Sequence, residues 1–174
     1  MHKTLIGLFC ATALFSTTLL ASGESHFTAG DFTLTLIGGG SSDNDFDSST
    51  SYIQLGLGHY ITDQFAVNLR QDLGFIDIGD SNFYNASTRV GGQYVWAVNQ
   101  FAPYFGANIG VVYGDVLKNQ FIAGPNLGTK FFVNETTFIN LGIEYQFLFR
   151  NTSGAQDGFK DGRFVYELGM GVRW

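Results

Sequence analysis

Large apolar residues alternate with polar residues or glycine through long stretches of this chain. Between Arg163 and Trp174, every even position is apolar: Phe164, Tyr166, Leu168, Met170, Val172 and Trp174. The odd positions of the same stretch include Arg163, Glu167 and Arg173. A period of two places all the apolar residues on one face of a β-strand, whereas a helix needs a period near 3.6. The pattern therefore predicts an all-β chain.

Eight such runs follow one another along the 174 residues. The predicted strands are 31–39, 51–61, 65–77, 87–98, 101–114, 121–133, 137–150 and 163–174. Their connections are of two kinds. Short polar turns are expected at Thr62-Asp63, Asn99-Gln100 and Asn134-Glu135, and longer loops at 39–50, 79–86, 115–120 and 151–162. Short turns at one end and long loops at the other are typical of membrane β-barrels, whose short turns are periplasmic.

The distribution of charge decides which face of the strands is outside. Only 14% of the residues are charged. We expect those in the strands to share one face with most of the strand glycines: Arg70, Asp72, Arg89, Lys130, Glu144, Arg150, Arg163, Glu167 and Arg173. An eight-stranded barrel is only just wide enough inside for side chains, so it cannot enclose the large apolar set. The sequence therefore predicts a closed, eight-stranded, antiparallel, up-and-down transmembrane β-barrel with an apolar outer face.

The aromatic residues are biased towards the strand ends, where aromatic side chains flank the apolar belt of membrane barrels. One expected girdle lies at the short turns: Phe65, Trp96, Phe101, Phe131, Phe138 and Trp174. The other lies towards the loops: Phe75, Tyr113, Phe121, Phe147, Phe149, Phe164 and Tyr166.

The first 23 residues have the layout of a secretory signal peptide. A basic start at Lys3 precedes an uncharged apolar run, and small residues follow at Ala21-Ser22-Gly23. We expect cleavage after Ala21 or Gly23, so that residues 1–23 form the signal and residues 24–174 the barrel domain.

Composition excludes several classes of function. The formal net charge of −6 and the pI of about 4.8 leave no basic surface for nucleic acid. A single cysteine excludes a disulfide framework, and we expect neither a cofactor nor a metal site. Acylating or deacylating barrels need a serine beside a histidine base at the outer rim. His26 and His59 do not offer that arrangement, so no catalytic residues are predicted.

The chain resembles the small outer-membrane β-barrel proteins of Gram-negative bacteria, which include the OmpA-, OmpX- and OmpW-like barrel domains. The resemblance rests on the signal peptide, the eight alternating strands and the final strand ending in Trp174, with strand–turn–strand stretches at 59–67 and 130–136. It implies residence in the bacterial outer membrane as a monomer, contact with outer-membrane lipid and lipopolysaccharide, and handling by the barrel-assembly machinery. It also implies an assembly signal in the last strand, formed by Phe164, Tyr166, Leu168, Met170, Val172 and Trp174.

Three functions compete for such a barrel. The favoured one is a structural or surface-interaction role with polar and acidic loops, because neither of the other two functions has stronger support in the sequence. A narrow channel or conduit for small or hydrophobic molecules is the alternative, and a lipopolysaccharide-modifying enzyme is less favoured.

A charge network is predicted inside the barrel. Its members are Arg70, Asp72, Arg89, Lys130, Glu144, Glu167 and Arg173. Glu144 and Glu167 are expected on neighbouring strands at similar height, where two carboxylates repel unless a cation lies between them. We therefore expect Arg70 or Arg89 to bridge at least one of these glutamates.

Overall fold

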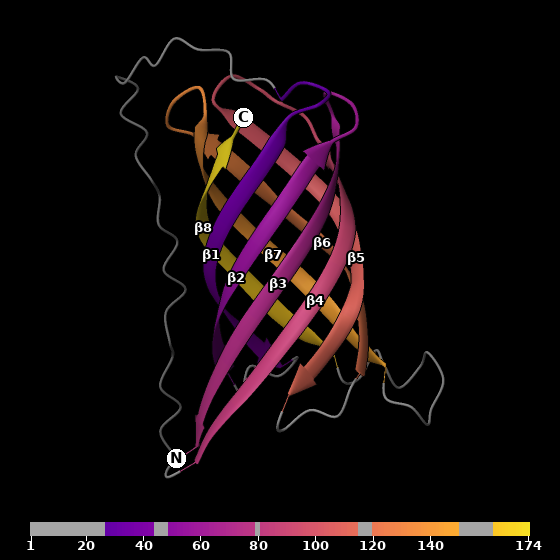
Figure 1. The fold of residues 1–174 in the computed structure, drawn as a ribbon, viewed down its shortest axis with the longest axis vertical. Coiled ribbons are helices and arrows are strands. Elements are labelled where there is room, and N and C mark those ends of the chain that lie inside the picture. Colours follow the sequence, from indigo (N-terminus) through magenta and orange to yellow (C-terminus); the bar gives the residue numbers. More distant parts are fainter. Residues whose placement is uncertain (1–26, 44–48, 79–80, 115–119, 150–161) are drawn as a thin grey trace, which may run out of the picture.

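The computed structural model describes residues 27–43, 49–78, 81–114, 120–149 and 162–174. They form a closed barrel in which each strand pairs antiparallel with the next and β1 pairs with β8 (Figure 1). The strands are β1 (Phe32–Asp43), β2 (Ser49–Tyr60), β3 (Phe65–Ile78), β4 (Ser81–Val95), β5 (Phe101–Gly114), β6 (Gln120–Phe132), β7 (Thr137–Phe149) and β8 (Arg163–Arg173). The predicted all-β, eight-stranded, up-and-down barrel is confirmed.

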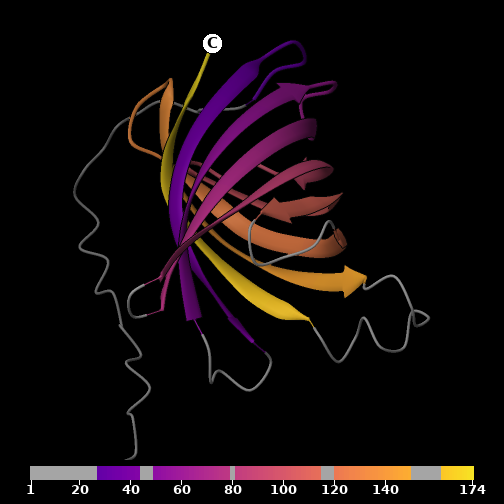
Figure 2. The ribbon, with the colours of Figure 1, turned by 60° about the horizontal axis from the view of Figure 1, so that its bottom comes forward.

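The strands run obliquely around the barrel axis, as closure of a sheet requires (Figure 2). We call the end that carries the β2–β3, β4–β5 and β6–β7 connections the turn end, and the opposite end the loop end. The carboxyl terminus lies at the turn end, at the top of Figure 1. No helix within the described ranges is long and apolar enough to cross a membrane.

The outer face is apolar. Leu36, Leu127 and Leu168 each expose 60% of their surface, although they lie in the middle of long strands. Among the strand side chains that the structure describes, no exposed residue is charged. A closed barrel with a mainly apolar, uncharged exterior is suited to a bilayer, where lipid covers that surface.

The lumen is filled by polar and aromatic side chains, and glycines on the facing strands make room for them. A Cβ atom added to Gly142 would lie 2.5 Å from the Tyr104 hydroxyl oxygen. One added to Gly110 would lie 2.7 Å from Cγ of Arg89. The predicted gathering of glycines in a crowded lumen therefore has a steric basis, because large inward side chains occupy the space that a Cβ would need.

Two of the predicted loops are shorter than expected. The loop expected at 79–86 is wrong, because β3 and β4 pair as far as Ile78 and Ser81. The loop expected at 39–50 is also too long, because Ser42 pairs with Ser49. The residues that extend β1 and β2 are polar or small, and those that extend β4 include the adjacent aromatics Phe83 and Tyr84, so neither stretch has the apolar alternation on which the prediction depended. Main-chain hydrogen bonds continue a hairpin without that alternation. The loops expected at 115–120 and 151–162 fall almost entirely outside the described residues.

Only one of the three predicted two-residue turns has that length. At Asn99-Gln100, Val98 and Phe101 exchange both main-chain hydrogen bonds, and Asn99 has a φ of 56°. The other two connections span 61–64 and 133–136. In each of these turns a side-chain oxygen accepts a hydrogen bond from a backbone nitrogen. Thr62 Oγ1 accepts from the nitrogen of Phe65 at 2.9 Å, and Asn134 Oδ1 accepts from the nitrogen of Thr137 at 2.8 Å.

Strand β4 also ends three residues earlier than predicted, at Val95. The backbone nitrogen of Trp96 donates to the oxygen of Pro103, but proline has no N–H to return the bond. The ladder therefore becomes irregular beside Pro103.

Most of the predicted aromatic girdles face outward. Phe65, Trp96, Phe101 and Trp174 are exposed at the turn end, and Tyr113, Phe121, Phe149 and Tyr166 towards the loop end. Phe138 is the exception, because it is fully buried inside the barrel. Its even position in β7 gives it the inward direction of Asn140 and Glu144, so its assignment to the outer girdle was wrong.

Candidate functional site: the barrel lumen

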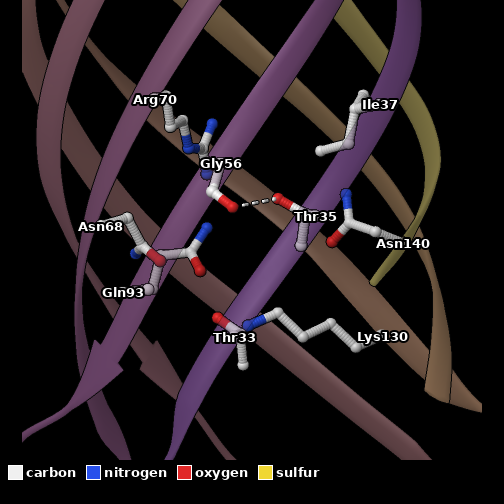
Figure 3. A pocket seen from close by; sticks show the side chains of 10 residues that line it. Thr33, Thr35, Ile37, Gly56, Asn68, Arg70, Gln93, Lys130 and Asn140 are labelled. Atoms are coloured by element: carbon white, nitrogen blue, oxygen red, sulfur yellow. Dashed lines mark hydrogen bonds between the residues drawn. The ribbon is translucent and has the colours of Figure 1, made fainter. Parts of the chain in front are cut away.

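The lumen contains three layers of side chains between the turn end and mid-height. Successive inward positions of β3 lead through them. Ala66 belongs to an aromatic cluster at the turn end, Asn68 lines a small polar cavity, and Asp72 belongs to an ion-paired layer. Arg70 borders both the cavity and the ion-paired layer (Figure 3). The period of two along the strand thus produces the layering.

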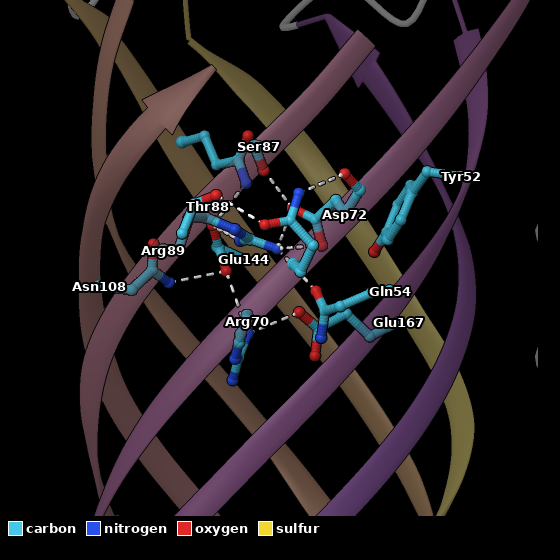
Figure 4. Close-up of polar contacts among 12 residues, drawn as sticks. Tyr52, Gln54, Arg70, Asp72, Ser87, Thr88, Arg89, Asn108, Glu144 and Glu167 are labelled. Atoms are coloured by element: carbon cyan, nitrogen blue, oxygen red, sulfur yellow. Dashed lines mark hydrogen bonds and ion pairs between the residues drawn. The ribbon is translucent and has the colours of Figure 1, made fainter. Parts of the chain in front are cut away.

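Arg89 is the centre of the ion-paired layer, which is drawn in Figure 4. Its side chain is fully buried, and Nη1 lies 2.5 Å from Glu144 Oε1. Nη2 lies 2.8 Å from Asp72 Oδ2 and donates to Gln54 Oε1 at 2.6 Å. Asp72 also accepts a short hydrogen bond from the Ser87 hydroxyl. One guanidinium therefore joins carboxylates from β3 and β7 across the lumen.

Glu144 is the most heavily contacted acceptor of the layer. Besides Arg89, it accepts from Gln146 Nε2 at 2.6 Å and from Asn108 Nδ2 at 2.7 Å. Arg70 Nη1 lies 3.4 Å from Glu144 Oε2 and 2.8 Å from Glu167 Oε1. Arg70 thus bridges the two glutamates, which is the contact expected from their placement on neighbouring strands. Fully buried carboxylates need such a set of donors, because each unpaired charge would carry a large desolvation penalty.

An aromatic cluster fills the turn end of the lumen. Its rings belong to Phe27, Tyr60, Tyr104, Phe132 and Phe138, all nearly inaccessible to solvent. Phe27 comes from the segment before β1, and its ring stacks on that of Tyr60 with centroids 4.1 Å apart.

Lys130 projects into this cluster. Its Nζ lies 4.9 Å from the ring centroid of Phe27 and between 5.3 and 5.6 Å from those of Tyr60, Tyr104 and Phe138. It also donates to the Tyr60 hydroxyl at 2.9 Å. An ammonium group within about 6 Å of aromatic faces gains cation–π attraction, which offsets part of the cost of its burial.

A turn at 28–31 holds Phe27 in place. Gly30 has a φ of 100°, in the left-handed region that favours glycine, and its nitrogen donates to the oxygen of Tyr60. The backbone nitrogen of Ala29 donates to Asp63 Oδ1 at 2.8 Å. Asp31 Oδ2 lies 2.9 Å from Arg173 Nη1. The segment is therefore fastened to the β2–β3 turn and to β8, so that Phe27 enters the lumen.

The structure brings together five of the seven predicted network residues: Arg70, Asp72, Arg89, Glu144 and Glu167. Lys130 and Arg173 lie outside this layer. Lys130 is one layer nearer the turn end, and Arg173 lies at the rim, where it contacts Asp31 and the backbone oxygen of Glu135. Their inward register is as predicted, but their height on the strand separates them from the carboxylates.

Sequence reasoning missed two parts of the lumen. The neutral partners Gln54, Asn108 and Gln146 occupy inward positions of predicted strands, so the period of two could have identified them. Phe27 gave no such signal, because it precedes the first alternating run.

The last strand presents its predicted assembly-signal residues outward. Tyr166, Leu168, Met170, Val172 and Trp174 are exposed, and Phe164 is half-buried. Trp174 and Phe32 exchange two main-chain hydrogen bonds, which continue the β1–β8 seam to the turn end. Within the described residues, no group of three or more histidine, cysteine, aspartate or glutamate side chains could hold a metal ion.

Comparison with known proteins gives a likeness of fold. No protein-family model and no curated protein sequence matches the chain. Among solved structures, OprG from Pseudomonas aeruginosa matches with a TM-score of 0.62 and 14% identity over 87% of this chain and 99% of OprG. Neisserial surface protein A matches with a TM-score of 0.61 and 14% identity over 84% of this chain and 96% of its own.

The same architecture also supports catalysis in another protein. The outer membrane enzyme PagL matches with a TM-score of 0.50 and 16% identity, over 80% of this chain and 98% of PagL. The fold alone therefore does not select among structural, channel and enzymatic roles. The chain has the fold of the small eight-stranded outer-membrane β-barrels of Gram-negative bacteria.

Proposed function

We propose that the protein is an outer-membrane barrel with a closed lumen, which serves as a rigid anchor for surface-exposed loops. The observation that carries this proposal is the ion-paired layer. Arg89 and Glu144 have no solvent-accessible side-chain surface, although they meet in the middle of the lumen. A water-filled path at this height would wet both groups. Their complete burial supports a barrel that is closed by paired charges.

The aromatic cluster supports closure at a second height. Phe27 and Phe138 expose 2% and 0% of their surfaces, and their rings lie 6.0 Å apart in an edge-on contact. A hydrated ion passing from the turn end would have to displace these rings and the buried ammonium of Lys130. Two closures of different chemistry thus lie in series.

A non-enzymatic role is part of the proposal. His59, the histidine within the described residues, faces outward, where its ring stacks on Phe32 with centroids 4.3 Å apart. An outward ring at the turn end is far from the outer rim, where a lipopolysaccharide-modifying site would need its base.

The partners follow from the surfaces. We propose that outer-membrane lipid covers the apolar exterior of a monomeric barrel, and that the loops meet lipopolysaccharide at the cell surface. The exposed apolar face of β8, which ends at Trp174, is suited to serve as the recognition signal for the barrel-assembly machinery.

Single-channel recording of the refolded protein in a planar bilayer tests the closed lumen. We expect a flat current trace for the wild-type protein over hundreds of millivolts. Reproducible conductance steps would contradict the proposal and favour the narrow channel.

Paired variants make the same experiment sharper. Because the two closures lie in series, Phe27→Ala and Arg89→Ala should each leave the barrel largely silent, whereas the double variant should conduct. Glu135→Ala, in the exposed turn between β6 and β7, serves as the control and should remain silent in the Phe27→Ala and Arg89→Ala backgrounds. A conducting Phe27→Ala variant would show that the ion-paired layer does not close the lumen.

A further inference from the structure

A small polar cavity separates the two closures. Its walls are formed by Thr33, Thr35, Ile37, Gly56, Gly58, Asn68, Arg70, Gln93, Lys130 and Asn140, and Figure 3 shows these side chains around it. The volume of about 20 Å³ is sufficient for one water-sized body. Polyatomic anions such as sulfate or phosphate are too large for it.

The cavity lies between two buried cations. Arg70 borders it on the side of the ion-paired layer, where both of its carboxylate contacts lie. Lys130 borders it on the side of the aromatic cluster. Within the described residues, Lys130 has no carboxylate partner within 4.0 Å, and its one hydrogen bond is to Tyr60. The aromatic rings stabilise the ammonium on one side only, so a buried positive charge borders the cavity without a counter-ion.

Neutral donors complete the walls. Asn140 is 3% exposed, and the Nδ2 atoms of Asn140 and Asn68 have no hydrogen-bond acceptor among the described residues. Buried amide nitrogens without a partner are rare, because each loses its hydration without a replacement. Both residues line the cavity, so an acceptor placed there would have unpartnered amide nitrogens among its neighbours.

We propose that this cavity binds one monatomic anion of the halide class, with chloride as the physiological occupant. A water molecule would leave the ammonium of Lys130 without a counter-ion. A halide accepts from amine, guanidinium and amide donors together, and its charge balances that of Lys130. The site does not depend on the proposed absence of conductance, since it concerns only the space between the two closures.

Bromide tests the site directly. Crystals of the full-length mature protein grown in sodium bromide should show an anomalous-scattering peak between Lys130 and Arg70. A water-sized peak without anomalous signal at this position would overturn the proposal.

Stability in solution provides the second measurement. The thermal unfolding midpoint of the detergent-solubilised protein should rise with chloride concentration when gluconate holds the ionic strength constant, because a ligand that binds only the folded state stabilises it. Arg163→Gln removes a cation that does not line the cavity, whose Nε donates to Gln146 Oε1 at 2.8 Å, and it should retain the chloride response. Equal midpoints in chloride and gluconate would refute the site.

Two variants inside the cavity separate anion binding from general salt effects. Lys130→Met removes the charge and should abolish the chloride response, although loss of the contact to Tyr60 could also impair folding. Asn140→Asp keeps the size of the side chain and supplies a built-in carboxylate. It should raise the midpoint in gluconate and remove the response to chloride. An Asn140→Asp protein that still responds to chloride like the wild type would contradict the proposal.

Discussion

Removal of the Arg89 side chain should be among the most destabilising single changes in the lumen. Arg89 contacts Glu144 at 2.5 Å, Gln54 at 2.6 Å and Asp72 at 2.8 Å, and its side chain is fully buried. In Arg89→Ala, Glu144 keeps Arg70, Asn108 and Gln146 as donors. Of the donors described above for Asp72, only the Ser87 hydroxyl remains. The loss therefore falls chiefly on Asp72.

Breaking a buried ion pair by removing one partner costs about 3–5 kcal/mol, and we expect a loss in this range for Arg89→Ala. Urea unfolding of the protein in lipid vesicles, followed by tryptophan fluorescence and by mobility of unboiled samples on gels, measures the free energy of unfolding. Because Asp72 is left as the least compensated charge, adding Asp72→Asn should restore part of the loss. Glu144→Gln in the same background should restore less.

Arg173→Ala is the matched control. Arg173 pairs with Asp31 at the rim, where 20% of each side chain is exposed, so its removal should cost less than that of the fully buried Arg89. Equal losses for Arg89→Ala and Arg173→Ala would refute the reasoning, as would a failure of Asp72→Asn to restore stability.

Three further changes test the facing of the strands and the packing of the lumen. Leu141→Arg places a charge on the lipid face and should cost about 2–4 kcal/mol in urea unfolding, whereas Glu135→Arg in the exposed turn should cost almost nothing. Gly142→Ala places a Cβ 2.5 Å from the Tyr104 hydroxyl and should cost about 1–3 kcal/mol. In a Tyr104→Phe background that cost should fall, and an unchanged cost would locate the strain elsewhere. Phe27→Ala should cost about 3 kcal/mol, near the lower end of Phe→Ala losses in cores, because the segment that carries Phe27 precedes the first strand of the closed ladder and can adjust. Hydrogen exchange at the amide of Gly30 should rise in this variant, and unchanged exchange would show that Phe27 does not hold the turn.

The sequence could predict which strand residues point into the lumen and which point to lipid, because side chains alternate with a period of two in any strand. Once Glu144 and Glu167 were assigned to the inner face of adjacent strands, electrostatics required a cation between them, and Arg70 fills that place. The extent of the strands was less predictable. Beyond the apolar belt, the ladder between β3 and β4 continues to Ile78 and Ser81, and residues 81–86 do not show the apolar alternation that would reveal it.

The division of the lumen into layers could not be read from the sequence, because it depends on the stagger between strands. A residue's height is set by register pairs such as Lys130 with Asn140 and Arg70 with Arg89. The predicted network included Lys130 and Arg173 because both face inward, and facing alone does not give a height. The register places Lys130 beside the aromatic cluster and Arg173 at the rim, away from the carboxylate layer.

In a barrel this narrow, charge and volume constrain each other. Arg89 fits the lumen because Gly110 faces it, and Tyr104 fits because Gly128 and Gly142 both lie beneath its hydroxyl. A variant that moves an arginine to a new position must therefore also place a glycine on the facing strand. Otherwise the new side chain will clash with a backbone that the closed ladder holds in place. A single substitution that only reverses a charge leaves the packing of the lumen nearly unchanged, but it leaves the former ion-pair partner buried without an opposite charge. The lumen is consequently specified by pairs of positions on different strands, one large and polar and the other without a side chain.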